Sequence, residues 1–177
     1  RALLLLLAMV SLTGVPYMVL MPVFAADVLG GQAHLLGVLT GAVGLGAVTG
    51  ALWLAARPTV RGLDHALVGA ATVFALGLIG FGLSRWLWLS LPLLVATGAG
   101  MMTTMAATNT LVQTLVDEDK RGRVMSFYTM AFFGMAPFGA LAGGAAAARI
   151  GAPATVAIGG ALTLVAVALF VRARPGV

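Results

Sequence analysis

The chain has 177 residues, of which 61% are hydrophobic and 8% are charged, and its mean hydropathy is +1.09. A soluble domain carries about 25% charged residues, so 10 basic and 5 acidic side chains cannot cover a water-facing surface. This composition excludes a soluble enzyme, a nucleic-acid-binding protein and a disordered tail, and it indicates an integral membrane protein in a lipid bilayer. Cysteine is absent, which excludes a disulfide framework, a thiolate metal site and a cysteine nucleophile.

Charged residues divide the sequence into six long uncharged blocks. A helix needs about 20 apolar residues to cross the hydrocarbon core, so each block holds one transmembrane helix. Outer-membrane strands would instead show roughly ten-residue segments of alternating hydrophobicity. The sequence therefore predicts an all-α membrane protein whose residues 1–177 form a single six-helix bundle. The expected spans are 3–25, 35–56, 65–84, 87–114, 124–147 and 152–171.

The basic residues gather on one side of the expected bundle. Six spans place both chain ends and the connections after spans two and four on the same side. Because basic residues are enriched in cytoplasmic loops, this distribution predicts cytoplasmic termini for a multi-pass protein. That side holds Arg1, Arg57, Arg61, Lys120, Arg121, Arg123, Arg172 and Arg174, and the other side holds Arg85 and Arg149.

Glycine pairs four residues apart predict close helix packing, because small residues let helix backbones approach each other. They are compatible with tight static packing or with helices that slide against their partners. Pro137, flanked by Gly134 and Gly139, is the best hinge candidate, because proline breaks a helix. The glycine pairs are Gly37 and Gly41, Gly46 and Gly50, and Gly139 and Gly143.

The fourth expected span carries the densest polar content. At 100° per residue, its two amides and two of its methionines fall on one helix face. An amide is costly in lipid unless it is hydrogen-bonded or wet. This face is therefore either the wall of a substrate cavity or a set of interhelical hydrogen bonds. The face comprises Met102, Met105, Asn109 and Gln113. The same span also carries three threonines, whose hydroxyls we expect to bond back to their own helix: Thr97, Thr104 and Thr108.

Residues 117–123 combine three acids and three bases, which predicts a solvated connection in which Gly122 permits a tight turn. Two interpretations remain open. The segment sets the topology through its bases, or its ion pairs form a latch that holds the ends of spans four and five together. The charged residues are Asp117, Glu118, Asp119, Lys120, Arg121 and Arg123.

Ionisable residues are missing from the middle of every expected span, so no proton-coupling site is visible. Asp27, at the outer end of the first span, is expected to be solvated. His34 and His65 show no metal-ligand spacing, and we expect neither a metal nor a cofactor. An intramembrane serine protease would need a Gly-x-Ser nucleophile with a histidine partner in the membrane. The serines lack that context, so we do not expect an enzyme.

Two segments carry a family resemblance. The run NTLVQTLVDEDKRGRVMSFY over 109–128, continuing through GMAPFGALAG to residue 143, resembles the tenth and eleventh helices of a major facilitator superfamily (MFS) transporter. It is most similar to the branch of the enterobactin exporter and the macrolide-efflux proteins. The run YMVLMPVFAADVLG over 17–30 is similar to the seventh helix of that branch. Many relatives have proline where Asp117 stands.

This resemblance implies the C-terminal half of a twelve-helix secondary exporter in the bacterial inner membrane, built as two inverted three-helix repeats. Such a protein moves small molecules, such as siderophores or drugs, by alternating access. Spans one and four, with Tyr17, would line its cavity. Spans two and five would face the missing N-terminal half through their glycine pairs, and spans three and six would pack outside. The alternative is a self-sufficient six-helix protein that dimerises to form a pore or transporter.

Overall fold

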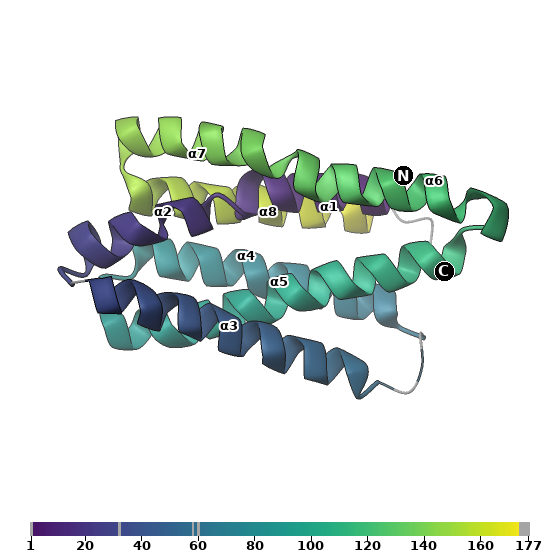
Figure 1. Ribbon diagram of the computed structural model, residues 1–177, viewed down its shortest axis with the longest axis horizontal. Coiled ribbons are helices and arrows are strands. Elements are labelled where there is room, and N and C mark those ends of the chain that lie inside the picture. Colours follow the sequence, from purple (N-terminus) through teal and green to yellow (C-terminus); the bar gives the residue numbers. More distant parts are fainter. Residues whose placement is uncertain (1, 32, 58, 60, 174–177) are drawn as a thin grey trace.

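Antiparallel helices run the length of one elongated bundle (Figure 1). The computed structural model describes residues 2–31, 33–57, 59 and 61–173. Within this part of the chain, six helical stretches are long and apolar enough to cross a membrane, which confirms the expected all-α membrane fold. The elements are α1 (Ala2–Met9), η1 (Val10–Gly14), α2 (Tyr17–Val23), η2 (Phe24–Val28), α3 (Ala33–Ala55), α4 (Leu63–Leu83), α5 (Leu87–Leu115), α6 (Glu118–Thr129), η3 (Met130–Gly134), α7 (Ala136–Ile150) and α8 (Ala152–Arg172).

Span one comprises α1 to η2 and span five comprises α6 to α7, whereas spans two, three, four and six are α3, α4, α5 and α8. The start of α1, the end of α8 and the α3–α4 and α5–α6 connections lie at one end of the bundle (Figure 1). Most of the described basic residues, including Arg57, Arg61 and those at 120–123, therefore share that end. Arg85 and Arg149 lie at the other end, where Gly151 adopts φ +84° to turn the chain from α7 into α8.

The six spans pack as two equivalent sets of three. Spans two and three pack on span four, and spans five and six pack on span one in the same way. Spans three and six pack on each other along the middle of the bundle. Exchanging spans one, two and three for spans four, five and six therefore reproduces these contacts, although α7 also packs on α8 whereas α3 and α4 make few contacts with each other. This equivalence is the packing expected of two three-helix repeats.

Two glycine pairs make equivalent contacts in the two sets. A Cβ at Gly46 of span two would overlap the Val95 carbonyl of span four. A Cβ at Gly139 of span five would lie 2.5 Å from the carbonyl oxygen of Leu12 in span one. Such distances leave no room for a side chain, so only glycine permits these backbone contacts. Each contact joins a helix of one repeat to a helix of the other.

The expectation that the glycine pairs of spans two and five form the interface with another half is wrong for two of the three pairs. Gly46–Gly50 and Gly139–Gly143 are covered by spans four and one of this chain. Added Cβ atoms at Gly37 and Gly41 would meet nothing within 4 Å, so this pair alone lies on an open face. The spacing reveals a small-residue surface, but it does not reveal which partner covers it.

Span five begins earlier than the sequence suggests. Only Val116 and Asp117 separate α5 from α6, and Gly122 lies inside α6 rather than in a tight turn. Glu118 and Asp119 stand in the first turn of α6, where acidic side chains interact favourably with the helix dipole. The charged segment therefore extends the helix beyond the apolar part of the span, and its charged side chains are all exposed.

We expect Gly46→Leu to destabilise the bundle by about 1–3 kcal/mol, the range found for overpacked cores, because the new side chain must displace the backbone of α5. Gly44→Leu on the same helix is the control, since a Cβ there meets nothing within 4 Å. Unfolding of both variants in detergent, followed by circular dichroism, measures the difference. Coincident unfolding transitions would show that the two helices do not depend on this contact.

Candidate functional site

Two of the three π-helical stretches meet at mid-bundle. η1 ends two residues before Pro16, and η3 ends three residues before Pro137. Proline lacks the N–H that would continue the helical ladder, and π-turns frequently mark functional sites. η1 and η3 contact each other directly, so the breaks in spans one and five form one irregular region.

A single side chain bridges the two breaks. The hydroxyl of Ser11, in η1, donates a hydrogen bond of 2.5 Å to the carbonyl oxygen of Phe132, in η3. Phe132 lies five residues before Pro137, so a continuing π ladder would leave its carbonyl without a donor. Ser11 is fully buried and Phe132 is 5% exposed. The bridge therefore satisfies a backbone acceptor where water is excluded.

Span six closes the same region from the other side. The hydroxyls of Thr13 and Thr163 lie 2.9 Å apart, and a Cβ at Gly159 would overlap the Thr13 carbonyl. A cavity of about 290 Å³ lies between spans one, five and six, and its walls include Pro16 and Tyr17. The broken part of span one is thus held by hydrogen bonds and borders empty space.

Tyrosine and methionine side chains of spans one, four and five gather next to the breaks. The Tyr17 hydroxyl lies 4.0 Å from the sulfur of Met101, and its ring meets Phe74 edge-on. The Tyr128 hydroxyl donates a 3.1 Å hydrogen bond to the Met105 carbonyl oxygen. We call Tyr17, Met101, Met105 and Tyr128 the tyrosine–methionine cluster.

Asn109 links this cluster to the end of span four. Its side-chain oxygen Oδ1 accepts a hydrogen bond from the Gln113 side-chain amide, and its side chain lies near the Tyr128 hydroxyl. Asn109 is half-buried, whereas Gln113 is exposed. The hydrogen bond between the two amides thus stays within span four, whereas the hydrogen bond between spans four and five joins the Tyr128 hydroxyl to the Met105 backbone carbonyl. The partial exposure leaves Asn109 accessible from one side.

The other residues that the sequence singled out lie outside the tyrosine–methionine cluster. Met102 is half-buried, but it makes no recorded polar contact with the cluster. Gly139 is buried against span one, and Pro137 is exposed in the first turn of α7. The break therefore precedes Pro137, at Met130–Met135. The expected back-bonding is confirmed for Thr97, Thr104 and Thr108, each of which donates to the carbonyl four residues earlier.

The charged segment forms local ion pairs. Lys120 pairs with Asp117 at 3.1 Å, and Arg121 lies 4.0 Å from Glu118. Both pairs connect residues three apart at the start of α6 and are exposed to solvent. Exposed pairs contribute roughly 0–1 kcal/mol. In this conformation the ion pairs of the segment stay within residues 117–121 and do not bind the body of α5.

The sequence alone does not predict three residues of this region. They are Tyr128 and Met101 of the cluster, and Ser11, whose sequence context excludes only the role of a nucleophile. The sequence does show a serine within an apolar run of span one, and prolines in spans one and five. These features are the signal that could have indicated a polar contact at the helix breaks. Hydroxyls in membrane helices usually bond to their own helix, so nothing in that signal identified the Phe132 carbonyl as the partner.

We expect Ser11→Ala to destabilise the chain by about 1 kcal/mol and to raise amide hydrogen exchange in residues 130–136, because the Phe132 carbonyl loses its donor. Ser126→Ala is the matched control, since Ser126 is exposed and bonds to Gly122 of its own helix. Exchange measured by mass spectrometry tests the pair. Equal exchange in both variants would contradict a role for the bridge.

Comparison with known proteins agrees with this architecture. A family model described as transmembrane secretion effector matches residues 1–175. A search of curated proteins finds no match. The match covers nearly the whole chain, and the family is of MFS type, as the resemblance at 109–143 and 17–30 suggested. The chain therefore belongs to the transmembrane secretion effector family of MFS-type membrane transporters.

Proposed function

We propose that the chain is the C-terminal six-helix half of an MFS-type exporter that moves small molecules, such as siderophores or drugs, by alternating access. The observation that carries this proposal is the meeting of the two helix breaks beside the tyrosine–methionine cluster. Transporters place interrupted helices at their binding sites near the bilayer midplane. Ser11, Phe132 and Tyr17 bring both features together in this chain.

The chemistry of the cluster favours a bulky substrate with few charges. Its side chains supply thioethers, aromatic rings and two phenols, with the Asn109 amide beside them; both tyrosines are buried in this conformation. Methionine adapts its shape to different partners, and aromatic rings supply apolar contact area. Asn109 and Gln113 can orient polar groups of the substrate at the edge of the cluster. Any charge that couples transport to an ion gradient would come from outside this half.

Spans two and five support an interface with another helical unit. They are the least buried of the six spans in this bundle. Gly37, Gly41 and Gly44 of α3 lie open, and small residues permit close approach of a further helix. In this proposal the N-terminal half covers the open face of α3 and the exposed side of α7.

The charged start of α6 is proposed to act as a conformational latch. Its local pairs are weak, so Glu118, Arg121 and Arg123 can exchange partners when the halves move. Asp117 anchors Lys120 in the conformation described here. Pro137 and Gly139, beyond the break at η3, then transmit the motion of α6 along span five.

The proposal predicts that Asn109→Leu lowers substrate export while membrane insertion is unchanged. The leucine removes the hydrogen bond to Gln113 and the amide offered to the substrate. Thr110→Leu is the neighbouring control, because Thr110 is exposed on another side of the helix and bonds to Ala106. Transport by full-length protein in everted vesicles measures both variants. Export by Asn109→Leu equal to that of the control would refute its role in the cavity.

Arg121→Ala is expected to change the balance between inward-open and outward-open states. The chain has no cysteine, so one cysteine introduced at Met105 reports the accessibility of the cluster to a membrane-impermeant maleimide. Arg85→Ala, an exposed arginine at the opposite end, provides the control. Identical labelling rates from each side in both variants would overturn the latch.

The coding sequence upstream of Arg1 separates a half-transporter from a self-sufficient dimer. Six further apolar blocks there support the half-transporter. A chain without them, purified as a transporting homodimer, would support the alternative and contradict the proposal.

A further inference from the structure

A further cavity lies away from the tyrosine–methionine cluster, between spans two, three and four. Its volume is about 580 Å³, within the range of roughly 300–1,000 Å³ found for ligand pockets. α3 and α4 both pack on α5 and make few contacts with each other. We call the resulting depression the α3–α4 groove. It is lined by Thr49, Gly50, Trp53, Ala66, Gly69, Ala70, Val73, Ala99, Gly100 and Thr103.

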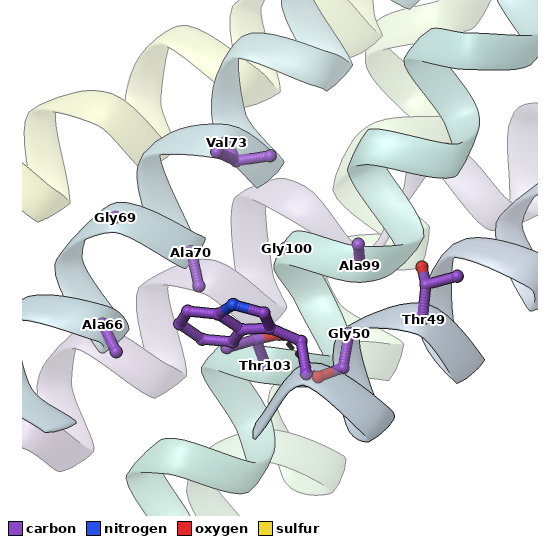
Figure 2. Close-up of a pocket in the computed structure, with 10 residues that line it drawn as sticks. Thr49, Gly50, Ala66, Gly69, Ala70, Val73, Ala99, Gly100 and Thr103 are labelled. Atoms are coloured by element: carbon purple, nitrogen blue, oxygen red, sulfur yellow. Dashed lines mark hydrogen bonds between the residues drawn. The ribbon is translucent and has the colours of Figure 1, made fainter. Parts of the chain in front are cut away.

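Small side chains give the groove its depth. Figure 2 shows Ala66, Gly69 and Ala70 along α4 facing Gly50 of α3, with α5 forming the floor. The two threonine hydroxyls in the wall already donate to backbone carbonyls of α3. The groove therefore offers an apolar surface with its polar groups satisfied. It is open along the membrane-spanning part of the bundle, which suits a hydrocarbon chain.

A cationic group stands next to one wall of the groove. The guanidinium carbon of Arg57 lies 5.2 Å from the ring centroid of Trp53, a cation–π geometry. A hydrogen bond of 3.4 Å from Arg57 to the Arg61 carbonyl oxygen also holds the side chain. Among the described residues, Arg57 forms no ion pair with a carboxylate. Arg57 is therefore positioned and available for an anion.

Arg57 lies at the depth where a lipid headgroup would stand relative to the membrane-spanning helices. Arg57 and Arg61 lie in the connection just beyond the end of α3, on the end of the bundle that carries most basic residues. Tryptophan is enriched at the membrane–water interface, and Trp53 is half-exposed one turn before Arg57. Basic positions between transmembrane helices on the cytoplasmic side bind anionic headgroups. The groove thus combines an apolar channel with a positively charged side chain at one end.

We propose that the α3–α4 groove is a binding site for one anionic glycerophospholipid, whose acyl chain lies along Ala66, Gly69 and Ala70 and whose phosphate binds Arg57. The lipid occupies the gap that α3 and α4 leave on α5, and it bridges these two helices, which make few contacts with each other. This site is independent of the transported substrate and of the proposed interface with another half.

The first experiment measures lipid retention by native mass spectrometry. The detergent-solubilised chain receives equal amounts of phosphatidylglycerol and phosphatidylcholine with the same acyl chains. We expect one retained phosphatidylglycerol, preferred about fivefold, the value for one arginine at an anionic surface. Equal retention of the two lipids would overturn the proposal.

Two pairs of variants separate the acyl chain from the headgroup. Gly69→Leu fills the groove, while Gly44→Leu places the same side chain on an open face; a Cβ at either position meets nothing within 4 Å. We expect only Gly69→Leu to lose the bound lipid. Arg57→Gln should remove the preference for phosphatidylglycerol but keep binding of both lipids, and Arg85→Gln should change nothing. Retention unaffected by Gly69→Leu, or a preference unaffected by Arg57→Gln, would contradict the site.

A third measurement leaves the groove residues unchanged. With Trp86 and Trp88 replaced by phenylalanine, Trp53 is the single tryptophan of the chain. Phosphatidylglycerol brominated on its acyl chains should quench Trp53 fluorescence more than brominated phosphatidylcholine at equal mole fraction. Equal quenching would refute the proposal. A dimer that forms with rising protein concentration and is lost in Gly69→Leu, without any lipid preference, would instead identify the groove as a contact between two copies.

Discussion

The structure depends on the need to satisfy every backbone polar group where water is excluded. Pro16 and Pro137 remove donors from spans one and five, and each span responds with a π-helical stretch before its proline. The Ser11 hydroxyl then supplies a donor to the Phe132 carbonyl. These irregular segments persist because span six, through Thr163, and the glycines of span five enclose them. Removal of that enclosure would leave unpaired polar groups in the bilayer.

The enclosure of the helix breaks also positions the hydroxyls of Tyr17 and Tyr128. The π-helical part of span one leads directly into α2, where Tyr17 contacts Met101 of span four. The helix before the break in span five carries Tyr128, which bonds to the Met105 carbonyl. The aromatic hydroxyls therefore stand on either side of the broken region, each bound to span four. A change in the breaks would alter the distance between the two hydroxyls and reshape the surface offered to a substrate.

The sequence predicted the class, the six spans and the distribution of basic residues, because charge and hydropathy respond to the membrane directly. It also predicted the face of span four that contains Met105 and Asn109, since helical periodicity alone determines it. It could not assign partners. Gly37–Gly41 and Gly46–Gly50 have the same spacing, yet only the second pair is covered, and this outcome depends on the position of α5. Residues 117–123 look like a loop by composition, but early acids and local ion pairs allow a helix.

The glycine contacts of the two repeats have a consequence for how the protein is made. Gly46 of span two needs span four, and Gly139 of span five needs span one. The most extensive helix contacts likewise join the two repeats rather than helices of the same repeat. A ribosome delivers the spans in order, so the first three helices enter the bilayer before their main partners exist. We therefore expect that neither triplet folds as a unit and that the early helices remain loosely associated until the later ones pack against them.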